Sequence, residues 1–368
     1  MEATLTWMAL MARKDKGCKA VRREVAAAGD PLEAWRQWEE RHLTEAREAM
    51  ALAGQQMEVA MEAGAEVVTC QDVRYPQMLA NIPDAPPVVY SRGRWPLEWG
   101  RALSVVGTRA CTRQGAEWAM QAGREWTEAG GLLVSGLARG IDGRAHHGAL
   151  QSSHGGRQVA VLPCSIDRVH PRMHESLAED IVDRGGLLVT EQPPGSQVER
   201  WMFASRNRIL TGLSATTVVI QSPARGGSLI SARCAFDQNR SLYTLWNRDL
   251  KGPSWSGNRA LVADNMAQPV TDIDDLWRHV GAEAEVRIAG IKAKNAAGLP
   301  KGCGKVWSEL HSDRATTWRE LHRSLRLAET ELNRQLFTLE SQGWIRRLPG
   351  RAYSVSYTHL TLPTKLEV

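Results

Sequence analysis

The chain has 368 residues, of which 43% are hydrophobic and 24% charged, and it carries a net charge of +5 at pH 7. This is the balance of a soluble globular protein with room for two or three domains. No apolar run approaches the roughly 20 residues that span a bilayer, no secretory signal pattern opens the chain, and the six scattered cysteines form no CxxC pair. We therefore expect a cytoplasmic protein with no membrane segment, no disulfide framework and no zinc site.

The first part of the chain is predicted to be helical. Residues 1–65 are rich in Ala, Glu, Met and Trp, and Pro31 is the only proline among them, which indicates an N-terminal helical module. Between Tyr75 and Pro87 the prolines become dense, and such a segment favours extended backbone over helix. We interpret it as an ordered connector that ends in a short strand.

The middle of the chain alternates between strand and helix patterns. Short, continuous apolar runs occur at 102–106, 132–134, 159–162, 187–189, 217–220 and 241–245, and helical stretches separate most of them. Continuous runs are typical of strands that are buried on both faces of a parallel sheet. We predict an α/β domain at 66–280 with a doubly wound, extended Rossmann-like and mostly parallel sheet.

The last third is predicted to hold a second, smaller domain. Residues 247–302 look irregular, and 281–302 form a linker rich in Ala, Gly and Lys. Three helical stretches and a hairpin pattern around Pro349-Gly350 then predict a winged-helix domain at 303–355. The final residues, 356–368, continue no pattern and resemble a translated sequencing or assembly artefact, so we exclude them from the predicted fold.

Two glycine-containing turns follow the first two strands of the predicted sheet. The first strand runs into Gly107-Thr108-Arg109, and the second runs into Gly136-Leu137-Ala138-Arg139-Gly140. Ligands bind beyond the carboxyl ends of strands in such sheets, and a helix N-terminus there favours an anion. The turns therefore predict phosphate binding, although ordinary turns with surface arginines would also fit. No dinucleotide fingerprint or Walker lysine motif is present, so we expect no nucleotide cofactor.

Asp142 and His146 allow two interpretations. Asp142 lies at the start of the helix after the second turn and His146 lies one turn later. They are either a helix cap and a partly buried histidine or an acid–base pair. The first is favoured because no nucleophile and no metal-ligand spacing accompany them.

Together these motifs resemble the DprA/Smf family of bacterial DNA-processing proteins. The residues that carry the resemblance are Tyr75-Pro76 with Leu79 and Pro86, Val106-Gly107-Thr108-Arg109, Ser135 through Asp142, Ala145-His146, Gly148-Ala149-Leu150, Arg206-Asn207-Arg208-Ile209, Gly212-Leu213-Ser214, Gly227-Ser228-Leu229-Ile230 with Ala232, and Gly257-Asn258. The resemblance spans roughly residues 66–275, and the stretch SGLARGID is its most specific part. The chain departs from the family pattern at Pro163-Cys164-Ser165, at Gly226 and near Leu245-Trp246.

The resemblance implies a protein without catalysis that binds single-stranded DNA in a basic groove, forms homodimers and helps to load the RecA recombinase during natural transformation. By motif, the residues that would face the strand are Gly107, Thr108, Arg109, Ser135, Gly136, Arg139, Arg206, Asn207 and Arg208, with Arg172 at a position that is often basic in the family. Contacts to phosphates carry no base identity, so binding should depend little on sequence. For residues 206–208, a set of salt bridges at the start of a helix is an equal alternative.

Two other functions compete with this one. A nucleotide or phosphoribosyl hydrolase would need a carboxylate beside a phosphate-binding turn, and Glu191 supplies one at the end of the fourth strand. A winged-helix transcription regulator would use the C-terminal domain, where residues 301–355 hold 10 Lys plus Arg against 6 Asp plus Glu. Binding to poly-dT, duplex DNA and free nucleotide distinguishes the three functions.

Overall fold

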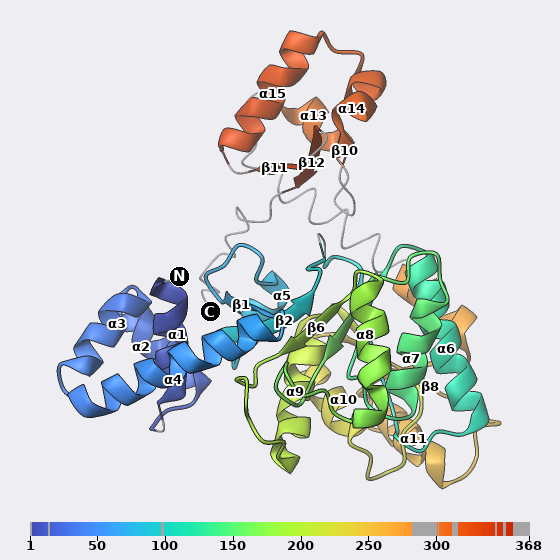
Figure 1. Ribbon diagram of the computed structural model, residues 1–368. Coiled ribbons are helices and arrows are strands. Elements are labelled where there is room, and N and C mark those ends of the chain that lie inside the picture. Colours follow the sequence, from blue (N-terminus) through green and yellow to red (C-terminus); the bar gives the residue numbers. More distant parts are fainter. Residues whose placement is uncertain are drawn as a thin grey trace, which may run out of the picture. The chain divides into compact units, whose positions relative to one another are not determined.

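The computed structural model describes residues 2–13, 15–96, 99–281, 300, 302–310, 316–342, 344–348 and 351–355. The chain divides into two compact units, Met1–Trp277 and Arg278–Val368, and each is described by itself (Figure 1). The boundaries that the sequence predicts at 65, 280 and 302 stay predictions. The predicted artefactual tail and most of the predicted linker lie outside the described residues.

The larger unit is built on a nine-stranded sheet with the order β1-β2-β6-β5-β4-β3-β7-β8-β9. Only the pairs β1–β2 and β2–β6 are antiparallel, and the other neighbours are parallel. The strands are β1 (Glu66–Thr69), β2 (Val88–Gly93), β3 (Ala102–Val106), β4 (Leu132–Ser135), β5 (Gln158–Val161), β6 (Leu187–Thr190), β7 (Thr216–Val219), β8 (Ser241–Leu245) and β9 (Gln268–Val270). The predicted doubly wound, mostly parallel sheet is confirmed. The order in which strands are added reverses next to β3: β4, β5 and β6 follow on one side of it, and β7, β8 and β9 follow on the other.

Helices cover both faces of this sheet, which explains the continuous apolar runs. All residues of β3, β4, β5, β6 and β7 are buried, so neither face of these strands needs polar side chains. The helices are α5 (Gln77–Ala80), α6 (Arg113–Glu128), α7 (Ile141–Leu150), α8 (Glu175–Asp183), α9 (Arg200–Gly212), α10 (Ser228–Asp237) and α11 (Ser256–Ala263), with short 3₁₀ turns η1 (Arg172–His174) and η2 (Pro253–Trp255). α6, α7 and α8 pack side by side, and α9 packs beside α10.

The expectation that residues 247–302 are irregular was wrong for its first part. The turn η2, the helix α11 and the edge strand β9 all lie there. β9 has only three residues, and its central residue, Pro269, argues against a strand when the sequence alone is considered. An edge position tolerates this proline because one side of the strand needs no partner.

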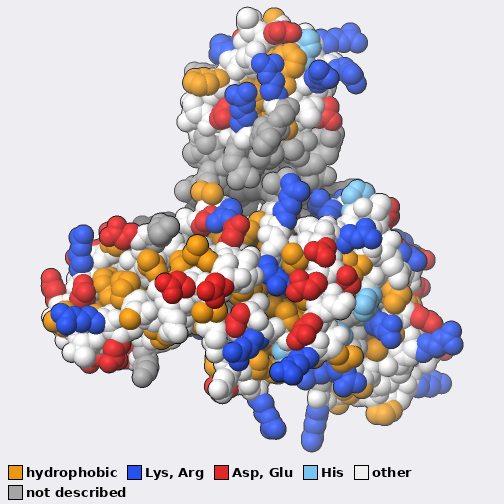
Figure 2. Space-filling view, viewed as in Figure 1, with side chains coloured by type: hydrophobic (Ala, Val, Ile, Leu, Met, Phe, Trp, Pro, Cys, Tyr) orange, Lys and Arg blue, Asp and Glu red, His pale blue; other side chains and the backbone are white. Residues whose placement is uncertain are grey.

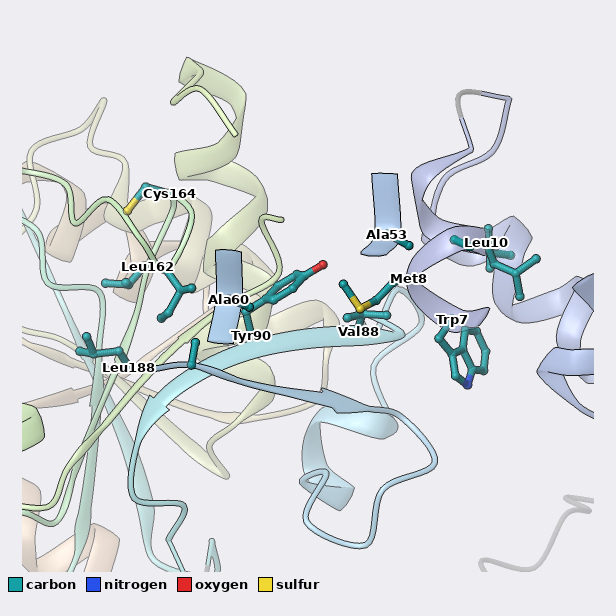
Figure 3. Close-up of a cluster of buried hydrophobic side chains, with 14 of the residues drawn as sticks. Trp7, Met8, Leu10, Ala53, Ala60, Val88, Tyr90, Leu162, Cys164 and Leu188 are labelled. Carbon is teal, nitrogen blue, oxygen red and sulfur yellow. The ribbon is translucent and has the colours of Figure 1, made fainter. Parts of the chain in front are cut away.

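The N-terminal helices share a hydrophobic core with the sheet. They are α1 (Glu2–Ala12), α2 (Cys18–Ala28), α3 (Pro31–Glu39) and α4 (Leu43–Glu62), as the composition predicts for this segment. Trp7 and Met8 of α1 belong to one cluster of buried side chains with Tyr90 of β2 and Leu188 of β6, and Figure 3 shows this cluster. The helices are therefore part of the same compact unit as the sheet.

The smaller unit has its own core. Its elements are α13 (Gly304–Glu309), β10 (Thr316–Thr317), α14 (Trp318–Leu325), α15 (Glu329–Ser341), β11 (Ile345–Leu348) and β12 (Ala352–Val355), and its strand order is β10-β12-β11. Trp307, Leu321, Leu332 and Leu336 are buried together. The helical stretches agree with the sequence pattern, and the winged-helix assignment stays a prediction.

None of the helices that the structure describes is both long and apolar enough to cross a bilayer.

Candidate functional site

The loops that follow β3 and β4 touch each other at the carboxyl edge of the sheet. The amide of Ile141 donates to the carbonyl oxygen of Thr108 at 3.2 Å. Gly140 has φ +79°, and a Cβ there would collide with that same carbonyl oxygen. A side chain would therefore push the two loops apart, so this close approach requires glycine. The two turns that the sequence predicts as phosphate-binding are brought together by this contact.

Arg109 and Arg139 are exposed on these two touching loops. The Arg109 guanidinium lies 4.9 Å from the ring centroid of Phe203, which comes from the first turn of α9. The Phe203 ring in turn meets His170 edge-on, with centroids 5.5 Å apart. Among the residues that the structure describes, no carboxylate pairs with either arginine, so both guanidinium groups are available to an anion from solution.

The segment after β5 joins the same edge. Arg172 is exposed at the start of η1. Two residues later, Nδ1 of His174 lies 2.8 Å from the carbonyl oxygen of Leu137, in the loop after β4. This contact holds the segment that carries Arg172 against the loop that carries Arg139. Three exposed arginines therefore follow three adjacent strands, β5, β4 and β3.

Arg206 is buried and does not lie on the surface of this edge. It is 5% exposed, and its Nη1 donates to the carbonyl oxygens of Gly136 and Val161, at the ends of β4 and β5. A Cβ on Gly136 would collide with this guanidinium and with the carboxylate of Asp142. The glycine is needed here because two charged side chains occupy the space of its missing Cβ.

Several other predicted site residues also serve as supports in this structure. Ser135 is fully buried, and its Oγ donates to the carbonyl oxygen of Val105 at 2.7 Å. Asn207 is 8% exposed. Arg208 forms ion pairs with Glu191 and Asp84, which matches the salt-bridge alternative for this cluster. Gly107 also has a packing reason, because a Cβ there would collide with the Ile141 side chain.

Asp142 and His146 do not form a pair with each other. The Asp142 carboxylate accepts hydrogen bonds from the amides of Gly136 and Ala138, and burial raises its pKa to about 6 against the opposing effect of Arg206. His146 Nδ1 lies 2.8 Å from Oε1 of Gln158, and burial lowers the pKa of this histidine to about 4. Each side chain is engaged by a different neighbour below the surface, which favours the structural interpretation.

The departure from the family pattern after β5 is accommodated in the core. Cys164 and Ile166 are buried in the cluster that also holds Leu162, and Ser165 beside them is fully buried. Burial raises the pKa of the Cys164 thiol, so the thiol stays neutral. The unusual residues thus fill space beneath the site and leave the loop surface to other side chains.

Phe203 is the residue of this edge that sequence reasoning missed. It lies three positions before Arg206, in a helix whose sequence motif is basic, and an isolated aromatic residue gives no sequence signal of its own.

Figure 2 shows Lys and Arg side chains projecting from the lower margin of the larger unit on the face in view, while basic and acidic side chains intermix elsewhere on that face. No group of metal-ligating side chains occurs within the described ranges.

The chain is similar to known proteins over most of this unit. A family model described as DNA recombination-mediator protein A matches residues 66–281. Protein Smf of Escherichia coli is 31% identical over 283 residues, which cover 75% of this chain and 74% of that protein. Protein Smf of Synechocystis is 37% identical over 186 residues, half of this chain but only 46% of that protein.

Two solved structures share the fold. DNA processing protein A of Streptococcus pneumoniae is 30% identical with a TM-score of 0.55, covering 64% of this chain and 81% of that one. The structure that describes the single-stranded DNA binding mode of DNA processing protein A from Helicobacter pylori has a TM-score of 0.53 at 24% identity, covering 60% of this chain and 98% of that one. At that identity the second likeness bears on the fold alone.

Proposed function

The chain belongs to the DNA recombination-mediator protein A family, and on that basis we propose that it binds single-stranded DNA at the carboxyl edge of its parallel sheet. The observation that carries the proposal is the pair of exposed arginines, Arg109 and Arg139, on two loops that contact each other. A guanidinium binds phosphate in a bidentate fork. Without a carboxylate partner, each fork is available for a phosphate of the strand.

The site has two layers in this proposal. Arg109, Arg139 and Arg172 form the layer that meets the strand, with the backbone of Gly107 and the side-chain hydroxyl of Thr108 between them. Arg206, Asn207, Arg208 and Ser135 form the layer beneath and act by holding the loops in place. The Phe203 ring gives the Arg109 guanidinium a flat surface to rest on, and such cation–π contacts limit the freedom of the arginine before DNA arrives.

Phosphate contacts make the binding largely independent of base sequence. In the cell, the protein would take part in DNA processing during natural transformation as a cytoplasmic homodimer and would help to load the RecA recombinase. We propose no catalytic activity and no cofactor, because Asp142 and His146 are buried and bonded elsewhere and Glu191 is paired with Arg208.

Fluorescence anisotropy with labelled oligo-dT and with a duplex of equal length, each over a series of salt concentrations, tests this function. We expect tighter binding to the single strand and a linear fall of log K with log salt, because phosphate binding releases counterions. Equal affinity for the duplex, or an affinity that salt does not change, would contradict the proposal.

A further inference from the structure

The loops after β7 and β8 lie on the same edge as the proposed strand site. β7 and β8 run parallel to β3, so their carboxyl ends point the same way. The amide of Thr108 donates to the carbonyl oxygen of Gln221 at 2.7 Å, which joins the loop after β3 to the loop after β7. The chain therefore continues this edge beyond the point where the strand order reverses.

A second set of hydrogen bonds joins the loop after β7 to the segment that follows β8. The amide of Ala224 donates to Oγ of Ser256 at 2.8 Å. The amide of Ser222 donates to Oδ1 of Asn258 at 2.7 Å, and the buried Asn258 amide also donates to the carbonyl oxygen of Leu245 at the end of β8. Loops after five adjacent strands, β5, β4, β3, β7 and β8, are thus hydrogen-bonded into one continuous rim.

Basic side chains continue along this rim past Arg109. Arg225 follows β7, and Arg248 and Lys251 follow β8, and all three are exposed. Within the part of the chain that the structure describes, none of the three side chains forms an ion pair. Together with Arg172, Arg139 and Arg109, they put at least one exposed cation after each of the five strands.

Carboxylates mark both ends of this basic rim. On one side Glu191, which directly follows β6, is held by Arg208. On the other side Asp272 and Asp274 follow β9, which is parallel to β8. The rim itself contains Asp167, which lies 3.5 Å from Arg168, and Asp249 next to Arg248. The cations outnumber these two carboxylates, so the stretch between β5 and β8 attracts a polyanion of limited length.

We propose that a single strand bound at Arg109 and Arg139 continues across the reversal point, and that Arg225, Arg248 and Lys251 bind its further phosphates. This inference rests on the proposed function and extends its site. Five strands about 4.8 Å apart give a rim of roughly 19 Å. That length accommodates at most about six phosphates at the 3.4 Å rise of a stacked strand, and fewer when the strand is extended.

The loops after β7 and β8 favour contacts with the phosphate backbone of DNA over contacts with its bases. The one aromatic side chain in the described loops 221–227 and 246–252 is that of Trp246, which is half-buried, so these loops offer bases little surface for stacking. Arginine and lysine bind phosphates without reading bases. The second half of the rim should therefore add affinity and length dependence without adding sequence preference.

The test compares the double variant Arg225→Gln/Arg248→Gln with the wild type on oligo-dT of increasing length. The matched control is Arg23→Gln/Arg47→Gln, which removes the same charge from two exposed arginines of α2 and α4. Affinity of the wild type should rise with length until the rim is filled. The rim variant should stop gaining affinity at a shorter length, bind the longest strands about tenfold more weakly at low salt, and lose about 1.4 from its salt slope, 0.7 for each lost phosphate contact.

The outcomes separate this inference from the proposed function. If the wild type does not bind single strands at all, the proposed function fails and the inference fails with it. If the wild type binds but the rim variant matches the control at every length, the strand does not cross the reversal point and only the inference is overturned. An equal loss on the shortest strands would also overturn it, since the two arginines would then belong to the first half of the site.

Discussion

Similar arginine motifs occur in the loops after β3 and β4 and in the first half of α9. In the structure the arginines of the loops are exposed, whereas Arg206 of the helix is buried. Arg109 and Arg139 of the loops are exposed and have no carboxylate partner among the described residues. Arg206 of α9 is 5% exposed and donates to two backbone carbonyl groups. An arginine near such a turn can therefore either be exposed to solvent or hold the turn in place, and its burial distinguishes the two.

The largest expected effect of this difference is on stability. Arg206→Ala should lower the free energy of unfolding by about 3–5 kcal/mol, because two buried carbonyl groups lose their donor and the buried Asp142 carboxylate loses the positive charge near it. Arg200→Ala at the exposed start of the same helix is the matched control and should cost little. Urea denaturation of both variants measures the difference, and a mild effect of Arg206→Ala equal to that of the control would show that Arg206 is not a support.

Asp142 and His146, which are buried beneath the loops, should make the free energy of unfolding depend on pH in opposite directions. The pKa of Asp142 is raised to about 6, above its ordinary value of about 3.9, so its folded form binds a proton more tightly and its contribution to stability falls between about pH 4 and 6. The pKa of His146 is lowered to about 4, from about 6.5, so its contribution rises between about pH 4 and 6.5. In the wild type the two largely offset each other.

Single variants should reveal each slope. Relative to the wild type, Asp142→Asn should gain stability as the pH rises from about 4 to 6, by up to about 1.4 kcal/mol per pH unit, and His146→Gln should lose stability over the same range. Thermal or urea unfolding at half-unit pH steps measures both. Parallel stability curves for the three proteins would mean that neither group titrates differently in the folded state.

A smaller effect is expected from the ion pair between Glu191 and Arg208 of α9. Glu191→Gln should cost roughly 1 kcal/mol of stability, because Arg208 loses a charged partner but keeps Asp84 at 3.4 Å. Affinity for single-stranded DNA should stay within about twofold, since Glu191 does not face the strand in this account. Sustained hydrolysis of a nucleotide by the wild type that Glu191→Gln abolishes would instead favour the enzyme.

The sequence predicts the sheet well and the role of each arginine poorly, for a physical reason. Strands such as β3 and β4 are buried on both faces, and their continuous apolar runs indicate that burial directly in the sequence. Arg109 is exposed and Arg206 is buried because of the contacts that tertiary packing brings to each side chain, and residue type and spacing do not encode those contacts. Phe203 was missed for the same reason, because its role comes from the loop that lies over it.

The most direct test of the account is a double-mutant cycle on Arg109 and Arg139, with melting temperature measured beside affinity for oligo-dT. Each Arg→Ala change should weaken binding about tenfold or more, from charged hydrogen bonds worth roughly 1.5–3 kcal/mol, while the melting temperature stays close to that of the wild type. If the two guanidinium groups share one phosphate, the double variant should lose less than the sum of the single losses. Wild-type affinity in folded Arg109→Ala and Arg139→Ala proteins would contradict the central claim that these two loops hold the strand.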